Sequence, residues 1–265
     1  MKKETATTDI NFRKYAQLFK GKKGIEIGGP SPIFKGEDGI PIYVLIDGLD
    51  GCNFSASTIW EGSIQEGINY HYRDDKVGYQ YINDGTELNR IPSGTYDFVI
   101  SSNCLEHIAN PLKALTEWIR IIKPGGLILL VLPDKETNFD HNRPITTLGH
   151  LIDDYHRNVG EEDLTHLQEI LELHDLPMDP PAGTYEDFKA RSLLNLENRA
   201  LHHHVFNISL LRDICEQIHL RILLSSKIKS DNMVLAIKGS GLVPPTVRFY
   251  YYRMLLSYYH RRKNI

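Results

Sequence analysis

Short apolar segments alternate with helical ones along this chain, and that alternation constrains the fold more than any other feature. Apolar runs of strand length occupy residues 24–27, 42–46, 79–82, 96–100 and 127–132. A helical pattern at 111–122 separates the last two, and Lys123-Pro124-Gly125-Gly126 ends it. Since the strands are apolar on both faces, the pattern predicts an α/β protein with a mainly parallel sheet covered by helices on both faces.

Residues 135–200 interrupt this alternation. They are rich in charge, histidine and proline, with helical stretches at 148–155 and 161–173. The alternation resumes with a helix at 208–218 and strands at 222–224 and 233–237. We therefore predict that the chain has four parts. The first of them begins with a short amphipathic helix at 11–19. The parts are a first core segment (1–134), an inserted helical cap (135–200), the last core helix and strands (201–240) and a C-terminal helix (241–265).

Composition excludes several classes of protein. The net charge is −4, which argues against non-specific binding of nucleic acid. The three cysteines form no CxxC pair, so we expect neither a disulfide framework nor a thiolate zinc site. The first 20 residues lack the apolar segment of a signal peptide, and no apolar run is long enough to span a membrane. A cytoplasmic setting is expected.

The turn after the first strand is the first candidate binding element. Gly28 and Gly29 let the chain turn sharply and let a ligand approach the backbone closely. Pro30 and Ile33 stand where a dinucleotide fingerprint needs glycine, which disfavours nicotinamide and flavin cofactors. Glu26 lies in an otherwise apolar strand and needs a partner. A tight turn with a satisfied carboxylate is the alternative interpretation.

Acidic residues follow the second and third predicted strands. In an open parallel sheet, ligands bind at the carboxyl ends of the strands. Asp47 is thus a candidate for the ribose hydroxyls of a nucleoside, with Asp50 as a competitor, and Asp84 is a candidate for the adenine amino group. All three precede glycine, so they can equally be ordinary turn residues.

The most informative segment runs from residue 96 to residue 127. Residues 96–108 read Tyr-Asp-Phe-Val-Ile-Ser-Ser-Asn-Cys-Leu-Glu-His-Ile, and 121–127 read Ile-Ile-Lys-Pro-Gly-Gly-Leu. The order of the strand-opening aspartate, Leu-Glu-His, a helix and Lys-Pro-Gly-Gly resembles the class I S-adenosylmethionine-dependent methyltransferases over about residues 22–134. The resemblance implies a Rossmann-like fold with a mainly parallel seven-stranded sheet, methyltransferase activity, and S-adenosyl-L-methionine as the cofactor.

The same resemblance implies roles for individual residues. The loop of Glu26, Gly28 and Gly29 would pass the amino-acid tail of the cofactor, and Asp47 would bind its ribose. Asp84 and Gly85 would lie near adenine, with Asn103 and Cys104 near the sulfonium. The chain departs from the family at Pro30 and Pro32, and the interval before the second strand leaves room only for a short or distorted first helix.

The continuation beyond residue 132 resembles a bacterial subgroup whose members accompany glycosyltransferases in surface-glycan pathways. It carries Leu132-Pro133-Asp134-Lys135, Phe139-Asp140, Arg143-Pro144 and His150. This implies O-methylation of a sugar or other small-molecule intermediate of polysaccharide biosynthesis. The alternative is a non-catalytic cofactor-binding module in a glycan-assembly complex. A nucleic-acid acceptor is not expected, because the Asn/Asp-Pro-Pro-Tyr/Phe signature is missing after the fourth strand.

Several residues are candidates for proton transfer from an acceptor. His107 follows the fourth strand, although a histidine there can simply bond to backbone. Alternation along a strand would put His202 and His204 on one side, where Asp140 and His141 could join them in an acid/base cluster or metal site. No ligand spacing is tight, so no metal is assigned. The catalytic candidates are His107, Asp134, Asp140, His141 and His203.

Two further features have ordinary interpretations. His150, Asp153 and Asp154 share one face of a predicted helix, which we interpret as solvated. The basic, aromatic segment 241–265 is expected to pack on its own domain or on a dimer mate, with an anionic membrane surface as the alternative.

Overall fold

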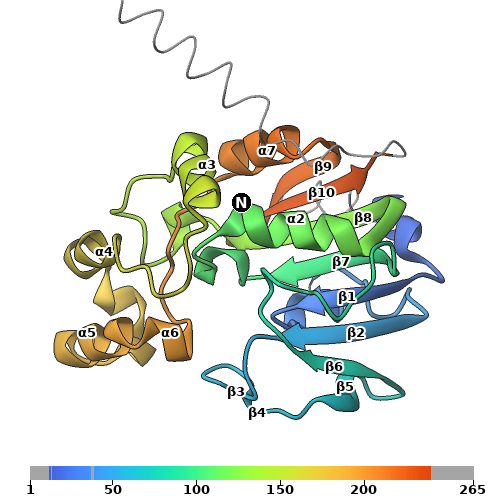
Figure 1. Cartoon of the computed structure of the whole chain (residues 1–265), viewed down its shortest axis with the longest axis horizontal. Coiled ribbons are helices and arrows are strands. Elements are labelled where there is room, and N and C mark those ends of the chain that lie inside the picture. Colours follow the sequence, from blue (N-terminus) through green and yellow to red (C-terminus); the bar gives the residue numbers. More distant parts are fainter. Residues whose placement is uncertain (1–11, 13, 37–38, 240–265) are drawn as a thin grey trace, which may run out of the picture.

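The computed structural model describes residues 12, 14–36 and 39–239. The predicted C-terminal helix at 241–265 and its proposed contacts lie outside the described residues. Within them, one mixed sheet of eight strands forms the centre of the molecule, in the order β5-β6-β2-β1-β7-β8-β10-β9 (Figure 1). The strands are β1 (Lys23–Ile27), β2 (Gly48–Asn53), β5 (Gly67–Arg73), β6 (Lys76–Ile82), β7 (Tyr96–Ser102), β8 (Ile122–Pro133), β9 (Leu220–Ile228) and β10 (Asp231–Lys238).

The five central strands, from β6 to β8, are parallel. Antiparallel strands close both ends, with β5 beside β6 at one edge and β10 and β9 beyond β8 at the other. This arrangement confirms the predicted α/β fold. The strand count is eight rather than seven because β5 adds a hairpin partner to β6, and the sequence analysis did not predict it. A separate pair, β3 (Ser57–Thr58) and β4 (Gly62–Ser63), forms a small hairpin.

Helices and chain segments cover both faces of the sheet. On one face, α2 (Pro111–Ile121) and α7 (Ile208–Gln217) bury their apolar sides in the larger core cluster. The Asn110 side chain caps α2 by accepting a hydrogen bond from the Lys113 amide, and Pro111 occupies the first helical position. On the other face, residues 12–46 supply the aromatic and aliphatic side chains of a second core cluster.

The predicted strand at 42–46 is wrong. These residues form turns, and Ile42, Tyr43 and Ile46 are buried in the second core cluster. The apolar run therefore reflects packing of a loop against the sheet, and the second strand is Gly48–Asn53. Between β1 and β2 the described residues form only a short 3-10 helix, Pro32–Phe34, which agrees with the short first helix expected from the sequence.

The segment 135–200 contains four α-helices, three short 3-10 helices and no strand of the large sheet. The helix expected at 161–173 begins only at Leu167. In Figure 1 the helices α4, α5 and α6 lie beyond the carboxyl ends of the parallel strands. A small apolar cluster of Ile170, Ala182, Phe188 and Leu201 holds them to the chain that returns to the core. The helices are α3 (Leu148–Arg157), α4 (Leu167–Leu173), α5 (Tyr185–Leu193) and α6 (Asn195–Asn198).

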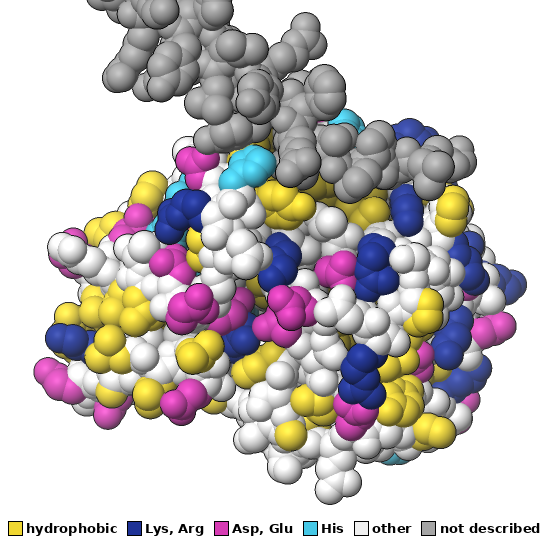
Figure 2. All heavy atoms as spheres, in the orientation of Figure 1, with side chains coloured by type: hydrophobic (Ala, Val, Ile, Leu, Met, Phe, Trp, Pro, Cys, Tyr) yellow, Lys and Arg dark blue, Asp and Glu magenta, His cyan; other side chains and the backbone are white. Residues whose placement is uncertain are grey.

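The surface of the described part mixes charges of both signs. Figure 2 shows Lys and Arg side chains interspersed with Asp and Glu on the visible face, without a continuous basic patch there. No helix among the described residues is long and apolar enough to cross a membrane.

Candidate active site

A cavity of about 480 Å³ opens at the carboxyl ends of β1, β2, β6 and β7. Residues that follow these strands line it, together with Asn138, Phe139, Arg199 and His202. The predicted cofactor residues Gly28, Asp84, Gly85, Asn103 and Cys104 all line it. The predicted catalytic residue His107 lines it as well. The site therefore lies where the sheet topology expects a ligand.

The backbone at Gly28 has a left-handed conformation and lies close to the Cys104 side chain. Its φ is +80°, and a Cβ atom there would lie 2.6 Å from the Cys104 Sγ atom. Its amide also donates a hydrogen bond to the carbonyl oxygen of Cys52. Only glycine fits this backbone conformation without strain, so the loop can present its backbone to the cavity.

Glu26 lies behind this loop and does not line the cavity. Its buried carboxylate accepts hydrogen bonds from the Ser31 amide (2.9 Å), the Tyr43 hydroxyl (2.6 Å) and the Tyr70 hydroxyl (2.7 Å). Burial raises the pKa of Glu26, and the three donors oppose that shift. Gly29 also lies outside the lining, because the Glu26 carboxyl group occupies the space of its missing side chain. Both residues shape the loop, as the alternative interpretation of this turn expected.

Asp47 does not occupy the position assigned to it. It precedes β2 at the amino end of the sheet, where its carbonyl oxygen accepts a hydrogen bond from Lys76, and it does not line the cavity. Asn53 ends β2 instead, lines the cavity, and donates a hydrogen bond to the Gly29 carbonyl oxygen at 3.0 Å. The competitor Asp50 is buried inside β2, where it accepts a hydrogen bond from the Tyr96 hydroxyl. Asp47 was assigned wrongly because the second strand was predicted at 42–46 and is in fact Gly48–Asn53.

Asp84 is fixed at the cavity edge by an ion pair. Its carboxylate accepts hydrogen bonds from the Thr86 amide and hydroxyl and, at 3.0 Å, from Arg199. Burial alone would raise the pKa of Asp84, but Thr86 and Arg199 lower it below its usual value. Arg199 also pairs with Glu161 and lies over the Phe54 ring, so it joins the segment 135–200 to the core at this edge. Arg199 was not among the residues predicted from the sequence.

The polar wall of the cavity consists of Glu106, His107 and His202. One ligand-type atom from each lies within 4.8 Å of the others. Both carboxylate oxygens of Glu106 are buried without a hydrogen-bond partner among the described residues, and burial raises the pKa of Glu106 to about 7. The His107 Nδ1 atom lies 3.1 Å from the Leu201 carbonyl oxygen, and burial holds the pKa of His107 well below its usual value.

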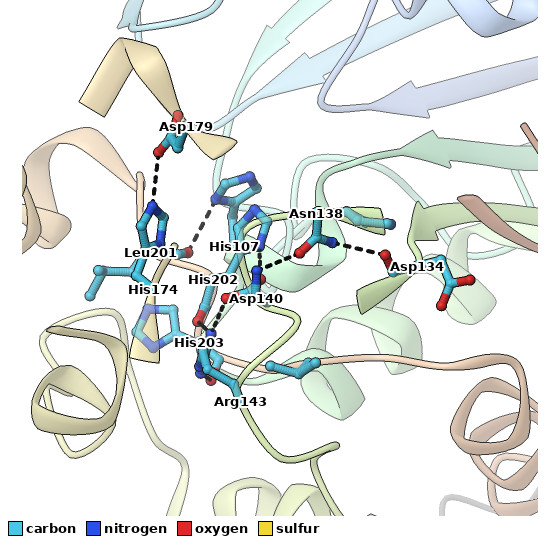
Figure 3. Close-up of polar contacts among 12 residues, drawn as sticks. His107, Asp134, Asn138, Asp140, Arg143, His174, Asp179, Leu201, His202 and His203 are labelled. Atoms are coloured by element: carbon cyan, nitrogen blue, oxygen red, sulfur yellow. Dashed lines mark hydrogen bonds and ion pairs between the residues drawn. The ribbon is translucent and has the colours of Figure 1, made fainter. Parts of the chain in front are cut away.

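His202 differs from His107 because a carboxylate holds it. Its Nδ1 atom lies 2.5 Å from Asp140 Oδ2 (Figure 3). Asp140 is buried and receives a second contact from the Arg143 guanidinium at 2.8 Å. Burial would raise the pKa of Asp140, but His202 and Arg143 together lower it. Asp140 is therefore an anion aimed at the inner nitrogen of a histidine that lines the cavity.

The remaining catalytic candidates lie outside the cavity lining. Asp134 forms a close ion pair with Lys227. His141 contacts Asp175 at 2.7 Å, and His203 is buried against Asn195 at 2.9 Å. Each side chain thus has a structural partner. His202 and His204 do not share a partner either, because only His202 meets Asp140.

Asp231 lines the cavity and carries a testable pH dependence. Burial, with added repulsion from Asp134, raises the pKa of Asp231 to about 6. The protonated carboxyl group of Asp231 therefore contributes stability. This contribution is fully present below the pKa of Asp231 in the unfolded chain, and it is lost as the pH rises through about 6. We expect Asp231→Asn to stabilise the fold by about 1 kcal/mol at about pH 8, after allowance for solvent screening, and by nothing measurable near pH 4. Urea unfolding at both pH values measures this, and an equal gain at both would contradict it.

Comparison with known proteins now identifies the family. A family model described as "Methyltransferase domain" matches residues 13–224, which is most of the chain, and the chain belongs to this family. The comparison with curated proteins gives no match. Membership makes the chain an enzyme, a methyltransferase, as the sequence predicted, and confirms S-adenosyl-L-methionine as its cofactor.

One solved structure supports the fold. An S-adenosylmethionine-dependent methyltransferase from Mesorhizobium loti is 9% identical with a TM-score of 0.50, and the match covers 86% of this chain and 96% of that one. A methyltransferase from Aquifex aeolicus is 13% identical with a TM-score of 0.47, covering 88% and 90%. At such identities the likeness of the first supports the shared fold alone.

Proposed function

We propose that this methyltransferase O-methylates a sugar or other small-molecule intermediate of surface-glycan biosynthesis in the cytoplasm. The observation that carries the proposal is the pair of His202, which lines the cavity, and the buried Asp140 behind it, 2.5 Å apart. A hydroxyl acceptor has to lose its proton when it is methylated, and a carboxylate-backed histidine is suited to receive it.

The chain's own residues fit the cofactor at the strand ends. The backbone at Gly28 is open to the cavity, and the lining offers amide and carboxylate groups at Asn53 and Asp84 for a nucleoside. Asn103 and Cys104 form the adjoining wall. We assign Gly28, Asn53, Asp84, Gly85, Asn103 and Cys104 to the cofactor site. When bound there, the cofactor supplies an activated methyl group.

Asp140 determines what His202 can do. Because the carboxylate is anionic and accepts from Nδ1, the proton of a neutral His202 ring stays on Nδ1 and the Nε2 lone pair is left free. His202 then accepts the proton of the acceptor hydroxyl at Nε2, and Asp140 stabilises the resulting cation. Arg143 keeps Asp140 ionised and oriented through its 2.8 Å contact. Asp140 and Arg143 are positioning residues in this proposal.

The acceptor side of the cavity suits a sugar. Trp60 and Phe139 offer aromatic surface, and Asn138, Glu61 and Asp231 offer hydrogen-bonding groups around it. A sugar ring combines apolar C–H faces with hydroxyl groups, so such a mixture can hold it in one orientation. The resemblance of residues 132–150 to glycan-pathway methyltransferases points to the same class of acceptor.

Two measurements on the full chain test the proposal. Calorimetry with S-adenosylmethionine is expected to give one binding site per chain. Transfer of a labelled methyl group is then measured on matched panels of nucleotide sugars, oligosaccharides, amines and thiols, with the product bond assigned by NMR. Labelling of a sugar oxygen supports the proposal. Exclusive methylation of nitrogen or sulfur would contradict it, and cofactor binding with no transfer to any acceptor would favour the non-catalytic module instead.

A further inference from the structure

A second cluster of metal-binding side chains lies outside the cavity lining. His150 and Asp154 lie one turn apart on α3, His166 precedes α4, and His204 lies in the segment that leads to α7. One nitrogen or oxygen atom from each of the four lies within 4.8 Å of the others. The sequence predicts that the face of α3 bearing His150 and Asp154 is solvated. The structure buries Asp154 there instead, leaving it 2% exposed.

The spacing of these atoms fits a tetrahedral metal site. The Nε2 atoms of His150 and His166 are 2.9 Å apart, and Asp154 Oδ2 lies 3.0 Å from His150 Nε2 and 3.7 Å from His204 Nε2. A tetrahedral zinc ion with ligand bonds of about 2.0–2.1 Å separates its ligand atoms by about 3.3–3.4 Å. The three observed separations bracket that value.

The chemistry of the donors also fits. Asp154 and His204 are almost fully buried, and a buried carboxylate needs a compensating positive charge. Arg157 approaches Asp154 only to 4.0 Å. Three imidazoles and one carboxylate form a donor set typical of zinc.

We propose that His150, Asp154, His166 and His204 bind one zinc ion with a structural role. With four protein ligands the ion has no open position for a substrate. His204 Nε2 also contacts the Ala109 carbonyl oxygen at 3.1 Å. When zinc binds, His204 gives up this contact and binds the ion instead. The site joins α3 to the segments before α4 and α7, and α3 and α7 lie side by side in Figure 1. Because His202 is two residues from His204, the ion fixes the segment that carries His202.

Metal analysis of the full chain tests the site independently of the proposed function. We expect about one zinc per chain in the wild type, and less than about one fifth of that in His166→Ala. After removal of zinc by a chelator, Co²⁺ should restore one equivalent with the visible absorption of a tetrahedral site. The chelator should lower the Tm of the wild type and leave that of His166→Ala unchanged. His71→Ala, an exposed histidine on β5, is the matched control and should keep its zinc.

The cavity cluster provides the decisive comparison. Glu106→Gln removes a carboxylate from the cavity wall and should keep one zinc per chain. Loss of zinc in Glu106→Gln with retention in His166→Ala would overturn the proposal, as would a wild type that takes up no stoichiometric metal. His166→Ala should still bind S-adenosylmethionine, so a failure of cofactor binding in the wild type would count against the proposed function and not against the zinc site.

Discussion

Replacing His202 by glutamine is expected to lower kcat by about 10²–10⁴-fold, the usual contribution of a positioned general base. His202 lines the cavity, and Asp140 holds its Nδ1 atom at 2.5 Å. Glutamine keeps a polar side chain of similar reach but cannot accept a proton near neutral pH. The affinity for S-adenosylmethionine should stay within about threefold, because the assigned cofactor wall is formed by other residues. Single-turnover methyl transfer and calorimetry measure the two quantities separately.

His107→Gln is the matched comparison for this variant. The ring centroids of the two imidazoles lie 4.5 Å apart, and both line the same cavity. His107, however, bonds to a backbone carbonyl, and no hydrogen bond or ion pair joins it to a carboxylate among the described residues. We expect His107→Gln to lose less than about tenfold in kcat. If His107→Gln lost as much as predicted for His202→Gln while His202→Gln stayed active, proton acceptance would belong to His107, one of the catalytic candidates predicted from the sequence.

The part of the fold that the sequence predicts well depends on local patterns. The strand predicted at 96–100 and the helix predicted at 111–122 match β7 and α2 to within two residues. A continuous apolar strand, a helix with one apolar face, and clear start and stop residues specify these elements without help from distant parts of the chain. Two residues predicted to contact the cofactor, Asn103 and Cys104, directly follow β7 and line the cavity for the same reason.

The second strand shows where local patterns fail. Its sequence, Gly-Leu-Asp-Gly-Cys-Asn, has two glycines and a charge, whereas the preceding apolar run looks more like a strand. Gly51 is needed because the Tyr70 ring occupies the place of its side chain, and Asp50 is tolerated because Tyr96 donates a hydrogen bond to it. Both reasons are tertiary contacts, and neither can be seen in a short window of sequence.

Long-range pairing also limited the prediction of the site. Asp140 and His202 are 62 residues apart, and their pairing depends on how residues 135–200 return to the core. The sequence placed Asp140 in one possible cluster with His202, His204 and His141, because strand alternation would put the first two histidines on one side, but it listed His203 rather than His202 among the catalytic candidates. The described segment 200–207 is not a strand, so the two rings turn to different partners. Arg199 was missed because its ion pair with Asp84 spans 115 residues.

Gly28→Ala is expected to weaken S-adenosylmethionine binding by at least about 100-fold. Alanine rarely adopts a φ of +80°, and its Cβ atom would meet Cys104 at 2.6 Å, so the loop between β1 and the cavity has to move. Strain of about 1–3 kcal/mol is the usual cost of such a residue, and displacement of the loop removes contacts with the cofactor in addition. Calorimetry measures the affinity, and urea unfolding measures the loss of stability.

Gly125→Ala separates the two contributions to that effect. Gly125 also has a left-handed φ, +74°, but its Cβ position has no neighbour within 4 Å and it lies outside the cavity lining. Alanine at position 125 therefore causes backbone strain similar to that of alanine at position 28. Unlike alanine at position 28, it does not collide with Cys104 and does not lie near the assigned cofactor site. We expect Gly125→Ala to lose about 1 kcal/mol of stability and to bind S-adenosylmethionine like the wild type. Equal affinities for Gly28→Ala and Gly125→Ala would mean that the turn after β1 does not contact the cofactor, and the cofactor site assigned to the strand ends would have to be abandoned.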